Sequence, residues 1–143
     1  MKMQIEHVRG AFKTFGAPSI PWNEGVNREV DGKMIIGRPT QGYGDCDFTY
    51  AGKTLSPLPW ASEPTINLMK EGLELELGVT FDHCLAGLYI DETVGIPFHK
   101  DVIEGEGDLI VSVSLGAPRD FLVRNNESGA IRTIHLLHGD LVI

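Results

Sequence analysis

Two short motifs in this chain contain residue types that commonly bind metals. His99-Lys100-Asp101 and His138-Gly139-Asp140 each place an imidazole and a carboxylate two residues apart. In extended backbone, side chains with this spacing project from the same side of the strand. One histidine and one carboxylate are two of the three ligands of a facial iron site, which leaves positions for water, a cosubstrate and oxygen. The pattern alone is not specific, because the chain contains it twice.

The surrounding sequence favours the first motif. His99 follows Gly95-Ile96-Pro97-Phe98, which predicts a constricted turn, and a long strand-forming part of the chain comes after it. A folded sheet can therefore return a third ligand to this pair. Asp140 lies close to Ile143, so we expect no residue after it in this sequence to complete a triad. We therefore expect His99 and Asp101 to be the metal ligands and the catalytic residues.

Other candidate sites have less support from the residues. His83 and Cys84 are adjacent, and a strand directs adjacent side chains to opposite faces. Ser112 and Ser114 lack the GxSxG turn that exposes a nucleophilic serine. The sequence identifies no partner for two further histidines, His7 and His135.

One helix is predicted among the elements that must position the metal pair. Ser62 is the expected N-cap, Pro64 belongs to the first turn, and Gly78 ends the helix. The apolar face of this helix is expected to consist of Ile66, Leu68, Met69, Leu73 and Leu77.

The other predicted elements are short strands. From residue 10 to residue 44, glycine and proline interrupt every candidate element, so only short extended pieces are expected there. After Gly78, alternating and β-branched residues predict strands at 83–90, 109–115, 119–124, 131–137 and 140–143. The fold class is therefore mainly β with one or two helices (α+β), arranged as an antiparallel sandwich or jelly roll.

Composition indicates an ordinary globular domain. The chain has 143 residues and a formal net charge of −8, with +1 on residues 1–60 and −9 on residues 61–143. This charge distribution argues against strong electrostatic binding of nucleic acid by the whole chain. It is compatible with a local contact through the less acidic residues 1–60. Cys46 and Cys84 have no metal-binding spacing and are expected to be reduced. No membrane span or signal peptide is recognised, so we expect a cytoplasmic protein.

The order of the motifs resembles the AlkB-like dioxygenases, which use Fe(II) and 2-oxoglutarate, and in particular their branch that demethylates nucleic acids. The resemblance runs from Arg38 to Ile143. It is carried by Arg38-(four residues)-Tyr43-Gly44-Asp45, Tyr50-Ala51-Gly52, Pro57-Leu58-Pro59-Trp60, Phe81-Asp82-His83-Cys84-Leu85, Tyr89, His99-Lys100-Asp101, the segment from Ser112 to Phe121, and His138-Gly139-Asp140-Leu141.

The resemblance implies a role for five residues. His99 and Asp101 fall on the first two iron ligands, and Tyr89 falls on the tyrosine of an Asn-x-Tyr motif that contacts 2-oxoglutarate. Tyr50 matches the aromatic residue that stacks on the target base, and Arg38 lies in the segment that approaches the duplex. The asparagine of the Asn-x-Tyr motif is Gly87 in this chain, which removes a side-chain hydrogen bond to the cosubstrate.

The family's third iron ligand and its 2-oxoglutarate-binding arginines correspond to positions after Ile143. From the resemblance we therefore expect an incomplete jelly roll that lacks its C-terminal strands, and a chain that is not active by itself. The expected organisation is a loop-rich extension over residues 1–37 and an AlkB-like domain over residues 38–143. In this comparison His138 corresponds to a structural position at the start of a strand.

Three functions remain open at this point. The first is oxidative demethylation of alkylated bases in DNA or RNA, a form of repair in which the hydroxylated methyl group leaves as formaldehyde. The second is a catalytically inactive jelly-roll module that only binds. The third is a dioxygenase of the same fold that acts on protein, lipid or a small molecule, which suits the acidic residues 61–143 better. No membrane and no obligate protein partner is implied.

Overall fold

The computed structural model describes residues 4–35, 37–50, 53–91, 93–96, 98 and 109–143. In these residues the chain is mainly β with a single α-helix, which confirms the α+β class. The chain divides into two compact units, one formed by residues 1–17 and 105–143 and the other by residues 18–104. The boundary predicted between a loop-rich extension and an AlkB-like domain, at residues 37 and 38, was drawn from sequence motifs and stays a prediction.

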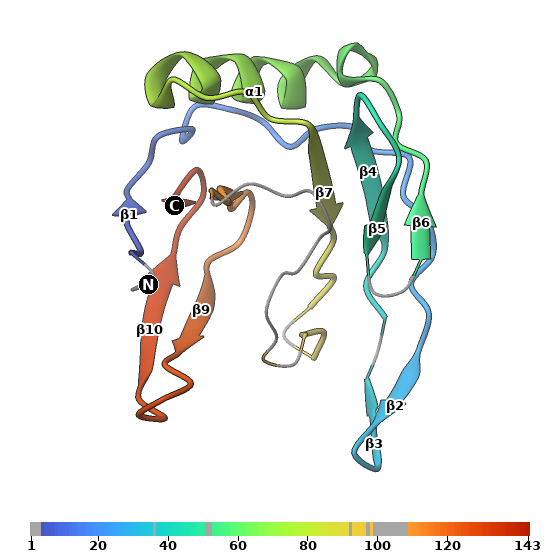
Figure 1. Ribbon diagram of the computed structural model, residues 1–143, viewed down its shortest axis with the longest axis vertical. Helices are drawn as coiled ribbons and strands as arrows, with labels where there is room; N and C mark the ends of the chain where they lie inside the picture. Colours follow the sequence, from blue (N-terminus) through green and yellow to red (C-terminus); the bar gives the residue numbers. More distant parts are fainter. Residues whose placement is uncertain (1–3, 36, 51–52, 92, 97, 99–108) are drawn as a thin grey trace. The chain divides into compact units, whose positions relative to one another are not determined.

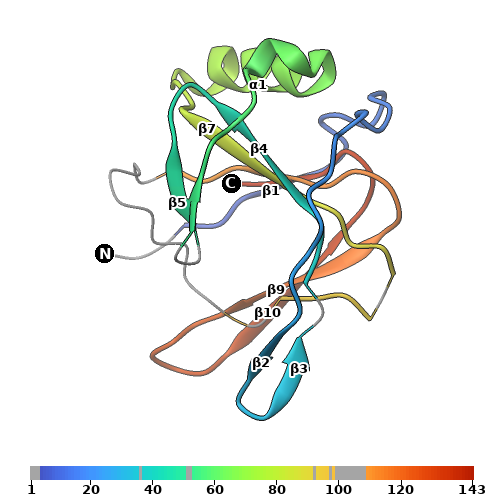
Figure 2. The ribbon, with the colours of Figure 1, turned by 90° about the vertical axis from the view of Figure 1, so that its right-hand side faces the viewer.

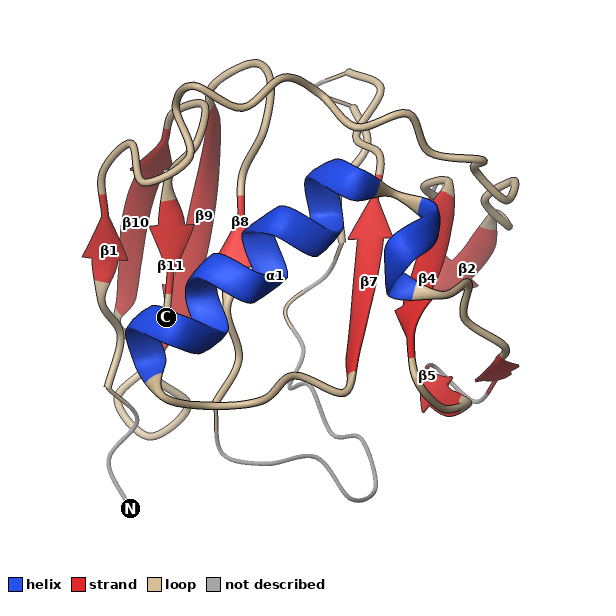
Figure 3. Cartoon of the chain, turned by 90° about the horizontal axis from the view of Figure 1, so that it is seen from above, coloured by secondary structure: helices blue, strands red, loops and turns tan. Residues whose placement is uncertain are grey.

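The first unit joins both ends of the chain in one small sheet. β1 (His7–Val8) pairs antiparallel with β11 (Leu141–Val142), which pairs in turn with β8 (Ser112–Val113). β11 is labelled in Figure 3. The strands predicted at 109–115 and 140–143 are thus present but shorter.

A hairpin of two six-residue strands completes this unit. β9 (Arg119–Arg124) and β10 (Ile131–Leu136) pair antiparallel along their whole length, as Figure 1 shows. The turn between them forms because the Asn125 side chain accepts hydrogen bonds from the backbone N–H groups of Glu127 and Ser128. The core of the unit contains Ile134, Leu136 and Val142, with Ile5 and Val123 packed against them.

The second unit is built from strand pairs and the helix. β4 (Thr40–Gly44) pairs antiparallel with β7 (His83–Gly87). Two hairpins accompany this pair, β2 (Arg28–Val30) with β3 (Lys33–Ile35), and β5 (Phe48–Tyr50) with β6 (Lys53–Leu55); the first of them is clear in Figure 2. β2, β3 and β4 are the short extended pieces expected before residue 44, and β7 is a shorter form of the strand predicted at 83–90. The hairpin at 48–55 was not predicted from the sequence.

The helix α1 (Pro64–Leu77) follows a short 3-10 turn at Trp60–Ser62 and is drawn in blue in Figure 3. Gly78 ends it in the left-handed conformation with φ of 66°, as predicted. The predicted N-cap was wrong by one residue. Glu63 caps the helix, because its carboxylate accepts from the Thr65 N–H, while the Ser62 hydroxyl donates to the Pro59 carbonyl.

The buried face of α1 is narrower than predicted. Ile66, Met69 and Leu73 are buried, but Leu68 is 58% exposed. The three buried residues follow the i, i+3, i+7 spacing of one helix face, and Leu68 lies off this face. No helix in the described part of the chain is long and apolar enough to cross a membrane.

Candidate functional site

The two predicted iron ligands, His99 and Asp101, lie outside the described residues. Within the described ranges, no three His, Cys, Asp or Glu side chains come close enough together to hold a metal ion. The described residues therefore offer no metal site of their own, and the assignment of His99 and Asp101 stays a prediction. Of Tyr50, only the backbone in β5 is described.

Arg38 and Tyr89 lie together beyond one end of the β4–β7 pair. Thr40 stands opposite Gly87 in this pair, and the Leu88 N–H donates to the Pro39 carbonyl at 2.9 Å, which extends the antiparallel pairing by one residue. Continuing the same register places Arg38 opposite Tyr89. The contact is direct, because the guanidinium carbon of Arg38 lies 5.6 Å from the centroid of the Tyr89 ring.

Gly87 provides the space in which the Arg38 side chain lies. A Cβ atom built on Gly87 would lie 2.7 Å from Nε and 3.2 Å from Cδ of Arg38. Residues 87 and 89 also share one face of an extended strand, so Arg38 contacts both from the neighbouring strand. Tyr89 is 36% exposed and Arg38 is partly buried. The Arg38 side chain thus lies between the backbone of Gly87 and the partly exposed ring of Tyr89.

The Tyr43-Gly44-Asp45 motif has a packing role. The Tyr43 side chain is 1% exposed, and burial, with a smaller contribution from the Glu63 carboxylate, raises the pKa of its phenol. A Cβ on Gly44 would lie 2.5 Å from the Asp82 carbonyl oxygen, so only glycine permits this approach between β4 and the start of β7. The Asp45 carboxylate accepts from the indole N–H of Trp60 at 3.3 Å.

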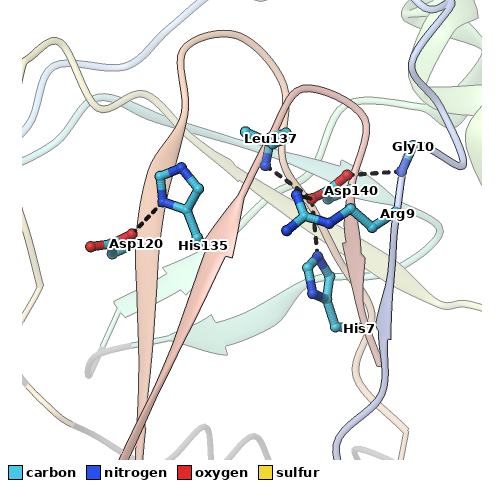
Figure 4. A network of polar contacts seen from close by, with 7 residues as sticks. All are labelled: His7, Arg9, Gly10, Asp120, His135, Leu137 and Asp140. Atoms are coloured by element: carbon cyan, nitrogen blue, oxygen red, sulfur yellow. Dashed lines mark hydrogen bonds and ion pairs between the residues drawn. The ribbon is translucent and has the colours of Figure 1, made fainter.

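The second His-x-Asp motif is structural, because hydrogen bonds within the first unit occupy both of its side chains. The Asp140 carboxylate is 1% exposed. Its Oδ2 accepts from the Leu137 N–H and from Nε2 of His7, both at 3.0 Å, and its Oδ1 accepts from the Gly10 N–H at 2.8 Å. Arg9 Nη1 lies 3.5 Å from Oδ2 (Figure 4).

These contacts hold Asp140 in its ionised form. The hydrogen bond from the Leu137 N–H, followed by those from His7 and Gly10, lowers the pKa of Asp140 to about 2, against the opposing effect of desolvation. Both ring nitrogens of His138 also have hydrogen-bond partners. Its Nδ1 accepts from the Gly116 N–H at 2.9 Å and its Nε2 donates to the Phe15 carbonyl at 2.7 Å, which leaves no ring nitrogen for a metal.

The structure also supplies partners for the two histidines to which the sequence assigned none. His7 donates to Asp140, and His135 Nδ1 lies 2.7 Å from Oδ1 of Asp120 in a pair that is exposed on both sides (Figure 4). His7 and Asp140 are 133 residues apart, so no local signal connects them. His135 and Asp120 face each other in the β9–β10 register, so pairing the strands predicted at 119–124 and 131–137 with each other is the step that could have found this contact.

Comparison with known proteins identifies the family. The sequence profile of the 2OG-Fe(II) oxygenase superfamily matches residues 25–143. The chain is 35% identical to protein R406 of Acanthamoeba polyphaga mimivirus over 78% of this chain and 59% of the viral protein. It is also 35% identical to the bovine DNA oxidative demethylase ALKBH2, over 80% of this chain and 45% of that protein.

A third relative is the human alpha-ketoglutarate-dependent dioxygenase alkB homolog 3, which is 32% identical over 73% of this chain and 37% of its own length. The chain thus spans between 37% and 59% of the length of these three relatives. Fe(II) and 2-oxoglutarate are the metal and the cosubstrate that define the family. Because the profile covers most of the sequence, this chain belongs to the 2OG-Fe(II) oxygenase superfamily.

Proposed function

We propose that the protein containing this chain is an AlkB-like dioxygenase that oxidatively removes N-alkyl groups from nucleobases of DNA or RNA. The observation that carries this proposal is the match of the oxygenase profile to residues 25–143, together with relatives named as a DNA oxidative demethylase and an alkB homolog. In this reaction an N-methyl group is hydroxylated and then leaves as formaldehyde. The oxidant is dioxygen, which Fe(II) would activate when bound, while 2-oxoglutarate would supply the other two electrons and be converted to succinate and carbon dioxide.

We propose the following roles for the site residues. His99 and Asp101 bind the iron, Tyr89 contacts the cosubstrate, and Tyr50 stacks on the target base. The proposed fold is a jelly roll, which the antiparallel pairing of β1, β8 and β11 and of β4 with β7 supports. The proposed location of the protein is the cytoplasm. A second candidate substrate is a methylated peptide, favoured by the charge of −9 on residues 61–143.

Metal binding by this chain tests the assignment of the ligands. Mn(II) serves as a redox-silent substitute for Fe(II), and its binding is measured by electron paramagnetic resonance. His99→Ala and Asp101→Ala are expected to abolish binding. The matched control is His135→Ala, which removes an exposed histidine from the β9–β10 hairpin and is expected to leave Mn(II) binding unchanged. Binding that depends on His135 and not on His99 would show that the ligand assignment is wrong.

Turnover by the protein that naturally contains these residues tests the substrate. Formaldehyde release is compared for oligonucleotides with and without N-methylated bases and for a methylated peptide. The proposal predicts release from the methylated oligonucleotides only, and Tyr50→Ala should weaken their binding, since base–aromatic stacking contributes about 1–3 kcal/mol. Release from the methylated peptide alone would favour the second candidate.

A further inference from the structure

A cavity of about 350 Å³ lies in the first unit, where two turns from opposite ends of the chain meet. It is lined by Arg9, Gly10, Lys13, Leu137, His138 and Asp140. This volume is at the lower end of the range that is typical of ligand-binding sites, so the cavity suits a small ligand. None of the residues proposed for the dioxygenase site lines it.

Backbone contacts fix the two turns against each other. The Phe12 N–H donates to the Gly139 carbonyl at 3.0 Å, and the Gly10 N–H donates to Oδ1 of Asp140 at 2.8 Å. A Cβ atom on Gly139 would lie 2.3 Å from the backbone nitrogen of Lys13, so the two turns are in close contact there. The walls of the cavity are therefore formed before a ligand binds, which lowers the entropic cost of binding.

Two cationic side chains at the cavity are available to a ligand. Lys13 is exposed, and its ammonium group has no hydrogen-bond or ion-pair partner among the described residues. The side chain of Arg9 is 58% exposed, and within the described part of the chain its contact is the one between Nη1 and Oδ2 of Asp140, at 3.5 Å (Figure 4). The other N–H groups of the guanidinium can thus donate to an anion.

The remaining polar side chains of the cavity are already paired within the protein. Asp140 is 1% exposed and both of its oxygens accept hydrogen bonds, and both ring nitrogens of His138 have partners. With Arg9 and Lys13 against Asp140, the lining has one more positive than negative charge.

The charge of the two units also favours this location for an anion. The first unit has six Lys/Arg and six Asp/Glu residues, whereas residues 18–104 have six Lys/Arg and fourteen Asp/Glu. An anionic ligand is therefore repelled less by the residues of the first unit than by those of the second.

We propose that this cavity binds a phosphate group through the Arg9 guanidinium and the Lys13 ammonium. The guanidinium donates two parallel hydrogen bonds to two phosphate oxygens, and the ammonium adds a third donor and a point charge. Phosphate fits both cations better than a carboxylate does, because the two oxygens of a carboxylate are already used by the guanidinium. The phosphate group can belong to inorganic phosphate, to a nucleotide or to a nucleic-acid backbone. This inference goes beyond the proposed function and does not depend on it.

NMR titration of the whole chain tests the site. Chemical shifts of backbone amides are followed with inorganic phosphate, adenosine monophosphate and an unmodified single-stranded oligonucleotide, each compared with sodium chloride at the same ionic strength. At least one of the three should shift the amides of Gly10 and Lys13 in a saturable way. The double variant Arg9→Gln with Lys13→Gln should weaken this binding about tenfold or more, because hydrogen bonds to a charged group are lost.

The matched control is Arg132→Gln, which removes the same charge from an exposed position of β10 in the same unit and should leave the Kd unchanged. Thermal melting verifies that each variant is folded. Lys13→Gln alone removes no contact of the ammonium group within the described residues, so it should weaken binding even if Arg9→Gln lowers the stability.

The three ligands identify the source of the phosphate. Binding of inorganic phosphate or adenosine monophosphate that depends on Lys13 supports a site for a small phosphate compound. Binding of the oligonucleotide alone supports a backbone contact, and the double variant should then reduce the slope of log K against log salt by about 0.7, the value for one phosphate on a single strand. The proposal is overturned if none of the three gives a saturable shift, or if Arg132→Gln weakens binding as much as the double variant.

Discussion

Replacing Asp140 by asparagine should destabilise the first unit more than any exposed substitution. The carboxylate accepts hydrogen bonds from two backbone N–H groups and from His7, and it is 1% exposed. The drop in its pKa from 3.8 to about 2 corresponds to about 2–3 kcal/mol at 1.4 kcal/mol per pKa unit. The asparagine amide also places an N–H group against one of these donors, which adds about 1 kcal/mol or more. We expect Asp140→Asn to lower the free energy of unfolding by about 3 kcal/mol at neutral pH.

The pH dependence follows from the direction of the shift. The folded-state pKa of Asp140, about 2, lies below its ordinary value of 3.8, so the folded state binds fewer protons than the unfolded state as the pH falls between these values. The contribution of Asp140 to stability is therefore present above pH 3.8 and is lost as the pH falls toward 2. The difference between wild type and Asp140→Asn should narrow over this window.

Urea denaturation followed by circular dichroism measures the stability difference at each pH. NMR adds a local probe, since the ¹³C carboxyl resonance of Asp140 should keep its ionised position down to pH 3, and the amide protons of Gly10 and Leu137 should exchange faster in the variant. The matched control is Asp120→Asn, whose side chain is 56% exposed. Its loss should change the stability by less than about 0.5 kcal/mol. Equal stabilities of Asp140→Asn and wild type at neutral pH would refute the reasoning.

Three further predictions concern other positions of the chain. The Tyr43 hydroxyl is buried with no hydrogen-bond partner among the described residues, so Tyr43→Phe should raise the free energy of unfolding by about 1 kcal/mol in thermal melts; a clear loss would reveal a hydrogen bond to the hydroxyl. Gly139 has φ of 85°, and a Cβ there would lie 2.3 Å from the backbone nitrogen of Lys13, so Gly139→Ala should cost about 1–3 kcal/mol in urea denaturation, and an unchanged midpoint would contradict this. Burial raises the pKa of the Cys84 thiol to about 11, so iodoacetamide at pH 8 should label the exposed Cys46 first in a mass-spectrometric time course; faster labelling of Cys84 would show that its thiol is accessible and ionised.

Local signals explain which parts of the fold were predictable. Pro64 and Gly78 act within their own turns, so the helix and its end followed from the residues alone. The N-cap is Glu63 and not the predicted Ser62, because the Ser62 hydroxyl donates to the Pro59 carbonyl. This contact depends on the preceding 3-10 turn, which the sequence analysis did not predict. The exposure of Leu68 depends on which face of the helix packs against the rest of the unit. The apolar residues of the helix cover more than that face, so their pattern alone wrongly included Leu68 among the buried residues.

The candidate site was less predictable because its contacts depend on strand register. Tyr89 and Arg38 were both identified, but for different ligands, and only the pairing of Thr40 with Gly87 brings them together. A register shift of one residue would direct Arg38 to the opposite face. The structural role of Asp140 could not be predicted from the sequence either, because its partner His7 is 133 residues away along the chain.

The pairing of β1 with β11 also determines the order in which the chain can fold during synthesis. Residues 18–104 are contiguous, so the second unit can form as soon as they have left the ribosome. The first unit cannot, because His7 pairs with Val142 and Gly10 with Asp140. Residues 7–10 must therefore remain without these partners until residues 140–142 have been translated, and closing so long a loop slows this step. During this interval residues 7 and 8 lack the strand that satisfies their backbone hydrogen bonds in the folded unit, and they are open to pairing with other extended segments.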